Sequence, residues 1–352
     1  MAELQFNGVG ISAIAAAVPK NIIRNIDYTT HFPQNDVLEI IDKTGIVERR
    51  FVSEGQCASD LCFAAAEKLI SDNNIDKSDI DLLIFISQTP DYRMPATSIL
   101  LQERLGLSKQ TMAFDINLGC SAFIYGLSVI YSLMERSGLK KALLLDGETR
   151  SKIYHPKDRK TAFLFGDGGV AALIERNDHF HKSYFNLGSD GSKSNLISMK
   201  SGGYRNPSSS ESFVELTYDE NGNISTDEHG KMDGGEVFNF VLKEIPSSVK
   251  KLMSDAEVTN SEIDFFVFHQ ANKFMNGYLQ KKFKIEDEKY PLSIAKFGNT
   301  SSVSIPLTIV SELESKMHGH KKLLLSGFGV GMSWASCVIE TENLKISKLI
   351  EI

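Results

Sequence analysis

The stretch SDIDLLIFISQT, residues 78–89, returns in altered form as SEIDFFVFHQAN, residues 261–272. Each copy begins with polar residues typical of a helix end and continues as an apolar run, which is typical of a strand buried on both faces. Asp81 and Asp264 stand at the same place in the two copies. This repeat is the first indication that the chain contains two related halves.

Two further pairs of segments support the repeat. KKALLLDGE (140–148) resembles KKLLLSGFG (321–329), and FGDGGVAALIE (165–175) resembles GVGMSWASCVIE (329–340). Chance similarity between leucine-rich strands explains one such pair, but not three in the same order. The period is about half the chain, whereas solenoid repeats are about 20–50 residues long, so a duplicated domain is favoured.

Helical stretches alternate with these strands, which predicts an α/β fold in which helices cover mixed or parallel sheets. The predicted helices cover residues 59–71, 121–136, 236–253 and 303–317. We expect an N-terminal half at 1–175 and a C-terminal half at 176–352. Residues 188–235 are rich in Gly, Ser and Asn, and they form a polar excursion that interrupts the symmetry.

Composition restricts the class of protein. The chain has 352 residues, is 42% hydrophobic and carries a formal net charge of −7, which favours a globular protein and argues against nucleic acid or anionic membrane as main partner. Glu3 precedes the first apolar run and Pro19 ends it, so we expect a strand there and no signal peptide. No run reaches the roughly 18 apolar residues of a membrane helix. A soluble, cytoplasmic protein is expected.

The four cysteines, Cys57, Cys62, Cys120 and Cys337, form no CxxC pair and show no His/Cys ligand spacing. The sequence therefore predicts free thiols and indicates neither a disulfide framework nor a metal site. No GxGxxG follows an early strand, which argues against a nicotinamide dehydrogenase.

Cys120 stands out within FDINLGCSAFIYGL, residues 114–127. Asn117 and Gly119 end a strand-like run, and Ser121 is a possible cap for the helix that follows. At a helix N-terminus the unpaired N–H groups and the dipole favour an anion, so the thiol pKa is expected to fall. The alternative is that Cys120 is a small buried apolar residue, as free cysteines often are.

Two other polar residues stand at comparable junctions. His269, in FHQAN, ends a predicted buried strand where the first half carries Ile86. Asn299 lies in KFGNTSSVSIP, in a turn before an apolar helix. Strand ends at a crevice are typical ligand sites of α/β sheets. Taken singly, each is equally typical of a structural residue, since Asn commonly shapes turns.

These segments resemble the β-ketoacyl-acyl carrier protein synthase III family of thiolase-like condensing enzymes. The resemblance covers nearly the whole chain, through TGIVERR (44–50), DINLGCSAF, MDGGEVFNF (232–240), FHQAN, FGNTSSVSIP and SGFGVGMSW (326–334). It implies a duplicated five-layer αβαβα thiolase fold and a homodimer.

The resemblance also implies roles for individual residues. Cys120 would be the nucleophile that carries the acyl group, and His269 and Asn299 would hold the enolate formed when malonyl thioester loses CO2. The backbone N–H groups of Cys120 and Gly331 would form the oxyanion hole. The substrates would be thioesters of coenzyme A or acyl carrier protein, with no other cofactor and no metal. Substrate-pocket positions would be Met94, Phe238 and Asn272, with Met94 near the place where a residue from the partner subunit closes the acyl tunnel. Carrier-protein docking positions would be Lys273, Lys281 and Lys282.

Three positions depart from the family pattern. Glu39 stands where many members carry a tryptophan that stacks on the adenine of coenzyme A. Phe274 and Asn239 replace basic residues of the carrier-docking surface. These changes favour a specialised synthase, with a primer other than the acetyl-coenzyme A of housekeeping fatty acid synthesis.

The expected function is decarboxylative Claisen condensation of an acyl thioester primer with malonyl carrier protein, giving β-ketoacyl carrier protein and CO2. One alternative is transfer of the Cys120-bound acyl group to an amine or alcohol. The other is a non-catalytic partner subunit. Asn299 favours condensation, because simple acyl transfer forms no enolate. The sequence leaves open the primer, its chain length and the pathway.

Overall fold

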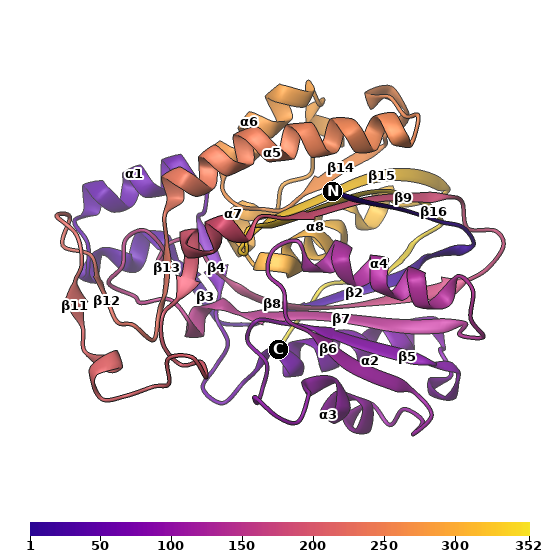
Figure 1. Cartoon of the computed structure of the whole chain (residues 1–352), viewed down its shortest axis with the longest axis horizontal. Helices are drawn as coiled ribbons and strands as arrows, with labels where there is room; N and C mark the ends of the chain where they lie inside the picture. The colour runs from indigo at the N-terminus through magenta and orange to yellow at the C-terminus, as the bar shows by residue number, and fades with distance from the viewer.

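Two β-sheets form the frame of the molecule (Figure 1). The computed structural model describes residues 1–352, apart from the side chains of Thr29 and Thr30. The first sheet has the strand order β17-β2-β8-β7-β5-β6, and β18 also pairs with β2. Its strands are β2 (Val9–Val18), β5 (Leu82–Ile86), β6 (Met112–Ile116), β7 (Lys141–Thr149), β8 (Asp167–Arg176), β17 (Lys345–Ile346) and β18 (Ile350–Glu351).

The second sheet has the order β1-β9-β16-β15-β14. Its strands are β1 (Ala2–Phe6), β9 (Ser183–Ser189), β14 (Phe265–Phe268), β15 (His320–Gly329) and β16 (Ser333–Glu342). In the first sheet β5 is parallel to β7 and β7 is antiparallel to β8. In the second sheet β14, β15 and β16 repeat that arrangement. The three sequence pairs therefore occupy equivalent places, as predicted.

The repeated aspartate has the same structural task in both sheets. Asp81 Oδ2 accepts a hydrogen bond from the backbone N–H of Lys141 at 3.1 Å, and Asp264 Oδ2 accepts one from Lys322 at 2.8 Å. Each carboxylate thus fastens the start of one strand to the start of its parallel neighbour. An unpaired backbone N–H at the sheet end is satisfied in this way.

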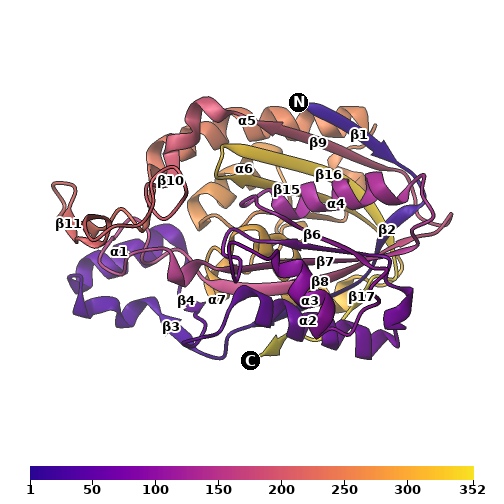
Figure 2. The same ribbon diagram turned by 60° about the horizontal axis from the view of Figure 1, so that its bottom comes forward.

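Helices complete five layers, which agree with the αβαβα arrangement expected (Figures 1 and 2). Between the sheets lie α4 (Ala122–Met134) and α8 (Ser304–Leu313), whose apolar residues join one face of each sheet in a single core. The helices α2 (Ala58–Asn73) and α3 (Thr97–Arg104) cover the outer face of the first sheet. The helices α5 (Gly234–Asp255) and α6 (Lys273–Phe283) cover the second.

The helix predictions are confirmed to within a few residues, and the differences occur at the ends. The helix predicted at 303–317 is α8, which ends at Leu313 and continues as a 3-10 turn over Glu314–Lys316. The helix predicted at 121–136 is α4, which is almost entirely buried because it packs between two sheets.

The polar segment between the halves forms small two-stranded ladders beside α1 (Gln34–Thr44) (Figure 1). One ladder pairs β10 (Ile197–Met199) with β13 (Gly230–Met232), and another pairs β11 (Leu216–Thr217) with β12 (Ile224–Ser225). A further ladder, from the N-terminal part of the chain, pairs β3 (Ile22–Arg24) with β4 (Glu48–Arg50) next to α7 (Ile294–Phe297).

Each end of the chain belongs to the sheet that is built mainly from the other half of the chain. The first strand, β1, lies in the second sheet, whereas β17 and β18 lie in the first. The division of the chain at residue 175 stays a prediction. All four cysteines are free thiols, as predicted. Of the helices described, none combines the length and apolarity needed to cross a bilayer.

Candidate active site

Cys120 lies in the turn between β6 and α4, and it is 7% exposed. The N–H of Ala122 donates to the carbonyl of Gly119 at 2.7 Å, which makes this turn continuous with the helix. The sulfur therefore lies at the helix mouth, where the dipole favours a thiolate. Ser121 does not cap the helix through its side chain, because its hydroxyl bonds Ser333 Oγ at 2.8 Å.

His269 follows directly after β14 and is held on two sides. Its Nδ1 lies 2.7 Å from Ser304 Oγ at the start of α8, and the ring of Phe328 meets the imidazole edge-on at 5.5 Å between centroids. Ser304 Oγ also accepts the backbone N–H of Gln270 at 3.3 Å, so its own hydrogen is able to point at Nδ1. Ser304 Oγ can therefore donate to the neutral imidazole or accept from the imidazolium, and in both forms Nε2 carries a proton and faces the pocket as a donor.

Asn299 is fixed by its own backbone and by its side-chain oxygen. The Asn299 N–H donates to the carbonyl of Leu164 at 2.8 Å, and Asn299 Oδ1 accepts the N–H of Ser301 at 2.9 Å. Because the oxygen is engaged by the chain, the amide NH2 is the free end of the carboxamide. The preceding Gly298 has φ +64 and its Cα approaches the Leu164 carbonyl so closely that a Cβ would lie 2.6 Å from the oxygen. A glycine is required there.

The three side chains predicted to act together line one enclosed pocket of about 50 Å³. Its walls are otherwise largely apolar and include Leu164, Phe165, Ile197, Met232, Val237, Val241, Met275 and Phe328. The first half of the chain supplies the cysteine, and the second half supplies the histidine and asparagine. The structure thus brings together residues that are 30 to 179 positions apart in the sequence.

The pKa of the Cys120 thiol is lowered to about 7. Burial alone would raise it, but the charge of His269 and a hydrogen bond from its ring outweigh that effect, with further contributions from Arg150 and Ser301. A pKa of about 7 gives a large thiolate fraction at neutral pH. The expected fall in the thiol pKa is therefore found, and its chief favourable cause is the imidazole across the pocket.

Arg150 is a part of this site that the sequence reasoning missed. Its Nη2 donates to Ser301 Oγ at 2.6 Å, and Ser301 Oγ lies 3.6 Å from Cys120 Sγ. The same guanidinium contacts Gln88 Oε1 at 2.8 Å and the carboxylate of Glu148 at 3.6 Å. The signal was DGETR (146–150), in which charged residues follow the buried run Ala142–Leu145. Charged residues at the carboxyl end of a buried strand indicate a ligand-binding crevice, since that is where α/β sheets bind their ligands.

Gly331 is not where the resemblance implied. Gly331 is exposed, and the pocket is lined by Gly329 and Val330 instead. Gly329 packs so tightly against the nucleophile that a Cβ would lie 2.7 Å from Cys120 Sγ. The assignment to Gly331 chose the wrong residue of a glycine-rich run, and the backbone of Gly329–Val330 is the candidate second oxyanion donor.

Of the three predicted substrate-pocket residues, the structure places one in the pocket lining and two outside it. Asn272 lines the pocket, and its Oδ1 caps α6 by accepting the N–H of Met275 at 2.8 Å. Met94 is 77% exposed and outside the pocket of this chain. Phe238 packs against Phe274 on the outer helices, at 4.8 Å between ring centroids. Neither Met94 nor Phe238 lines the described pocket of this chain, where Val237, the residue before Phe238, points inward instead.

A wider cavity of about 640 Å³ shares Leu164, Met232, Asn272 and Met275 with the inner pocket, so it forms a vestibule to it. Four cations line this vestibule, namely Lys43, Arg159, Lys160 and Lys231. Each has an acidic partner, in the order Glu39, Asp36, Asp219 and Asp227. Glu39 therefore forms an ion pair at this rim, and the pKa of its carboxyl is lowered chiefly by the hydrogen bond from Lys43.

The docking residues lie on α6. Lys273 begins this helix next to Asn272, while Lys281 and Lys282 are in its last turn, and all three are exposed. Phe274 is 64% exposed beside them. An apolar ring thus accompanies the predicted basic surface.

Comparison with solved structures places this architecture in a known class. The crystal structure of 3-oxoacyl-(acyl-carrier protein) synthase from Burkholderia xenovorans superimposes with a TM-score of 0.94 and 36% identity, covering 100% of this chain and 99% of that one. The corresponding structure from Thermus thermophilus gives a TM-score of 0.81 and 30% identity over 94% and 98% of the two chains. The fold and the cysteine, histidine and asparagine in one pocket therefore define a thiolase-fold protein.

Sequence comparison gives the family. Family models described as 3-oxoacyl-[acyl-carrier-protein (ACP)] synthase III and its C-terminal part match residues 114–191 and 253–341. A putative 3-oxoacyl-[acyl-carrier-protein] synthase 3 of Campylobacter jejuni is 36% identical, covering 97% of this chain and 96% of its own length. The β-ketoacyl-[acyl-carrier-protein] synthase III of Streptococcus agalactiae is 33% identical over 94% and 98%. The chain belongs to the β-ketoacyl-acyl carrier protein synthase III family.

Proposed function

We propose that this protein is a condensing enzyme, which joins an acyl thioester primer to malonyl-acyl carrier protein and releases β-ketoacyl-acyl carrier protein and CO2. The observation that carries the proposal is the convergence of Cys120, His269 and Asn299 on one largely apolar pocket. Family membership supports it, since the relatives compared are named as synthases of this reaction class.

In the first half-reaction, the Cys120 thiolate attacks the thioester carbonyl of the primer. The developing oxyanion lies at the start of α4, where the N–H of Cys120 and the adjacent Gly329–Val330 backbone are the candidate donors. The leaving thiolate, of coenzyme A or the carrier, departs with a proton from solvent, and the acyl group remains on sulfur. The pKa of about 7 favours this step, because the nucleophile is already partly ionised.

In the second half-reaction, the malonyl thioester loses CO2, and its electrons move into an enolate. The Nε2–H of His269 and the amide NH2 of Asn299 are placed to donate to that enolate oxygen, because Ser304 and the Ser301 backbone occupy the other ends of these side chains. The enolate carbon attacks the acyl carbonyl, and Cys120 leaves as thiolate. The departing CO2 supplies the carbanion, so no separate cofactor is required.

The acyl carrier protein is the proposed partner. The vestibule gives its thioester-bearing arm a route to the inner pocket, and Lys273, Lys281 and Lys282 offer cations to an acidic carrier. Homodimer formation is also proposed. The exposed Met94 and Tyr92, 77% and 63% accessible, are apolar side chains of the kind that a subunit interface covers.

The proposal is tested by measuring both products from purified protein. Primer thioesters of varied chain length, on coenzyme A and on carrier protein, are incubated with malonyl carrier protein. We expect CO2 and β-ketoacyl carrier protein in equal amounts. Transfer of the acyl group to an amine or alcohol without malonyl-dependent CO2 would instead establish the acyltransferase alternative.

A further inference from the structure

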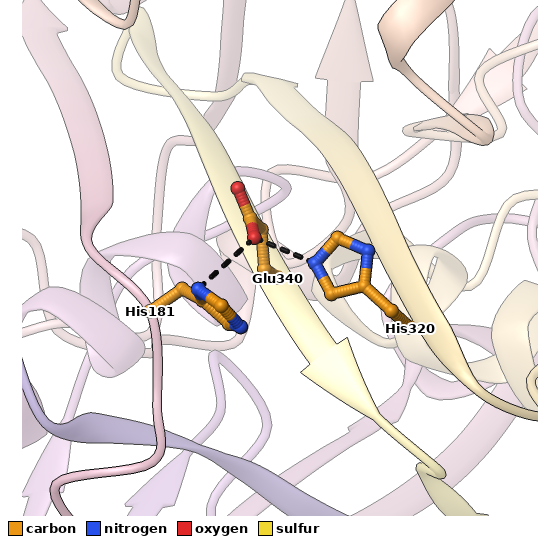
Figure 3. A group of neighbouring side chains, drawn as sticks. All are labelled: His181, His320 and Glu340. Atoms are coloured by element: carbon orange, nitrogen blue, oxygen red, sulfur yellow. Dashed lines mark hydrogen bonds and ion pairs between the residues drawn. The ribbon is translucent and has the colours of Figure 1, made fainter.

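Three ligand-type side chains meet on the surface of the second sheet, away from the pocket (Figure 3). They come from three segments: His181 from the loop before β9, His320 from the first position of β15, and Glu340 from β16. Their candidate ligand atoms all lie within 4.8 Å of one another.

The strand register explains why they meet. Glu340 lies opposite Lys322, so His320 is its diagonal neighbour on the same face of the sheet. On the other side of β16, Val338 pairs with Tyr184, and the chain that leads into β9 brings His181 alongside Glu340. Because the ligands are far apart in the sequence, no motif spacing could indicate the cluster.

The cluster is also remote from the proposed chemistry. His320 begins β15, whereas Gly329 ends it beside Cys120. Nine steps along the strand, at about 3.3 Å each, separate these two ends by about 30 Å. A ligand bound here therefore makes no contact with the catalytic pocket.

The distances suit a small divalent cation. Both imidazoles point at the same oxygen, since Glu340 Oε2 is 2.6 Å from His320 Nε2 and 3.5 Å from His181 Nδ1. Tetrahedral zinc, with bonds of about 2.0–2.2 Å, places its ligand atoms about 3.4 Å apart. The His181–Glu340 spacing already fits. The His320 ring is 45% exposed and has room for the shift of less than about 1 Å that its own spacing requires.

The chemistry of the donors selects the class of metal. Two imidazole nitrogens and one carboxylate form a common zinc donor set, with a fourth position left for water. Imidazole also suits Ni²⁺, Cu²⁺ and Co²⁺, whereas Mg²⁺ and Ca²⁺ favour oxygen donors alone.

One neighbouring cation opposes binding. Lys322 Nζ lies 3.2 Å from Glu340 Oε1, the oxygen that the imidazoles do not contact. The ammonium thus leaves Oε2 available while it reduces the net negative charge of the site. Each imidazole ligates a metal through an unprotonated ring nitrogen.

We propose that His181, His320 and Glu340 form a surface binding site for a zinc-class divalent cation. The ion would join the loop before β9 to the paired ends of β15 and β16. It would be a structural ion that holds together one end of the second sheet, and it would take no part in the proposed condensation reaction.

The test is calorimetric titration of the full chain, freed of any affinity tag and of metal, with ZnCl2 at neutral pH. Cys120 is first alkylated with iodoacetamide, because its thiolate and His269 are themselves able to bind zinc. We expect one ion per chain. Substitution His320→Gln or His181→Gln is expected to weaken binding at least about tenfold.

A matched control and a second readout make the result decisive. His318→Gln removes an exposed histidine two residues from His320 and is expected to bind zinc as the unmodified sequence does. Co²⁺ should give the visible spectrum of nitrogen and oxygen ligation without a thiolate band. Absence of binding, or binding that persists in both His181→Gln and His320→Gln, would overturn the proposal.

Discussion

The Arg150 guanidinium is predicted to hold down the pKa of the Cys120 thiol, and Arg150→Met tests this. The charge reaches the sulfur through Ser301 and lies at most about 6 Å away, which gives about 3 kcal/mol for the bare pair at an effective dielectric constant of about 20. Glu148 beside the guanidinium offsets part of that. We therefore expect the thiol pKa to rise by about 1 unit, or about 1.4 kcal/mol.

The assay is the rate of iodoacetamide alkylation of Cys120 as a function of pH, with the site verified by mass spectrometry. Only the thiolate reacts, so the rate rises with pH through the thiol pKa. Native protein is expected to reach half its maximal rate near pH 7, and Arg150→Met near pH 8.

Two controls separate this electrostatic effect from damage to the fold. Arg150→Met alone leaves the buried Glu148 unpaired, which is destabilising by roughly 3–5 kcal/mol. The double variant with Glu148→Gln removes both charges and should still show the raised pKa. Arg150→Lys keeps the charge and should titrate near the native value. An unchanged alkylation profile in the double variant would refute the reasoning.

Three further results are expected. His269→Gln should raise the thiol pKa, measured by the same alkylation profile, because the chief stabilising charge is lost; a profile like that of native protein would contradict this. Gly329→Ala should slow acylation of Cys120 at least about tenfold, measured by single-turnover mass spectrometry, because its Cβ would lie 2.7 Å from Sγ; acylation at the native rate would show that the backbone can move aside. Lys281→Glu with Lys282→Glu should raise KM for malonyl carrier protein with little change in kcat. In native protein, KM for malonyl carrier protein should rise as the salt concentration rises, because salt screens the same attraction. A KM unaffected by the double substitution would place the docking surface elsewhere.

The sequence was sufficient for the fold and the reacting groups because their signals are local. Asp81 and Asp264 mark equivalent strand starts, and each carboxylate satisfies the same backbone position in its sheet. Cys120 was identifiable because strand-ending residues precede it and a long apolar helix follows. His269 and Asn299 were identifiable at comparable junctions and through the family motifs.

Other features depend on three-dimensional packing and were missed. Arg150 is buried beside Cys120 only because β7 delivers it there, and the sequence alone does not show which way a charge at a strand end turns. Every second residue from 327 to 331 is a glycine, so the sequence does not show which glycine lies at the pocket. The close packing of Gly329 against Cys120 Sγ in the structure identifies it. Phe238 turns toward Phe274 on the outer helices instead of into the pocket.

The most direct test of the account is intact-protein mass spectrometry of Asn299→Ala during reaction with a primer thioester and malonyl carrier protein. Asn299 is assigned to the enolate and not to acyl transfer. We therefore predict that the acyl adduct on Cys120 forms and accumulates while CO2 release falls by at least about a hundredfold. Full CO2 release by this variant, or loss of the Cys120 adduct with the fold intact, would contradict the account.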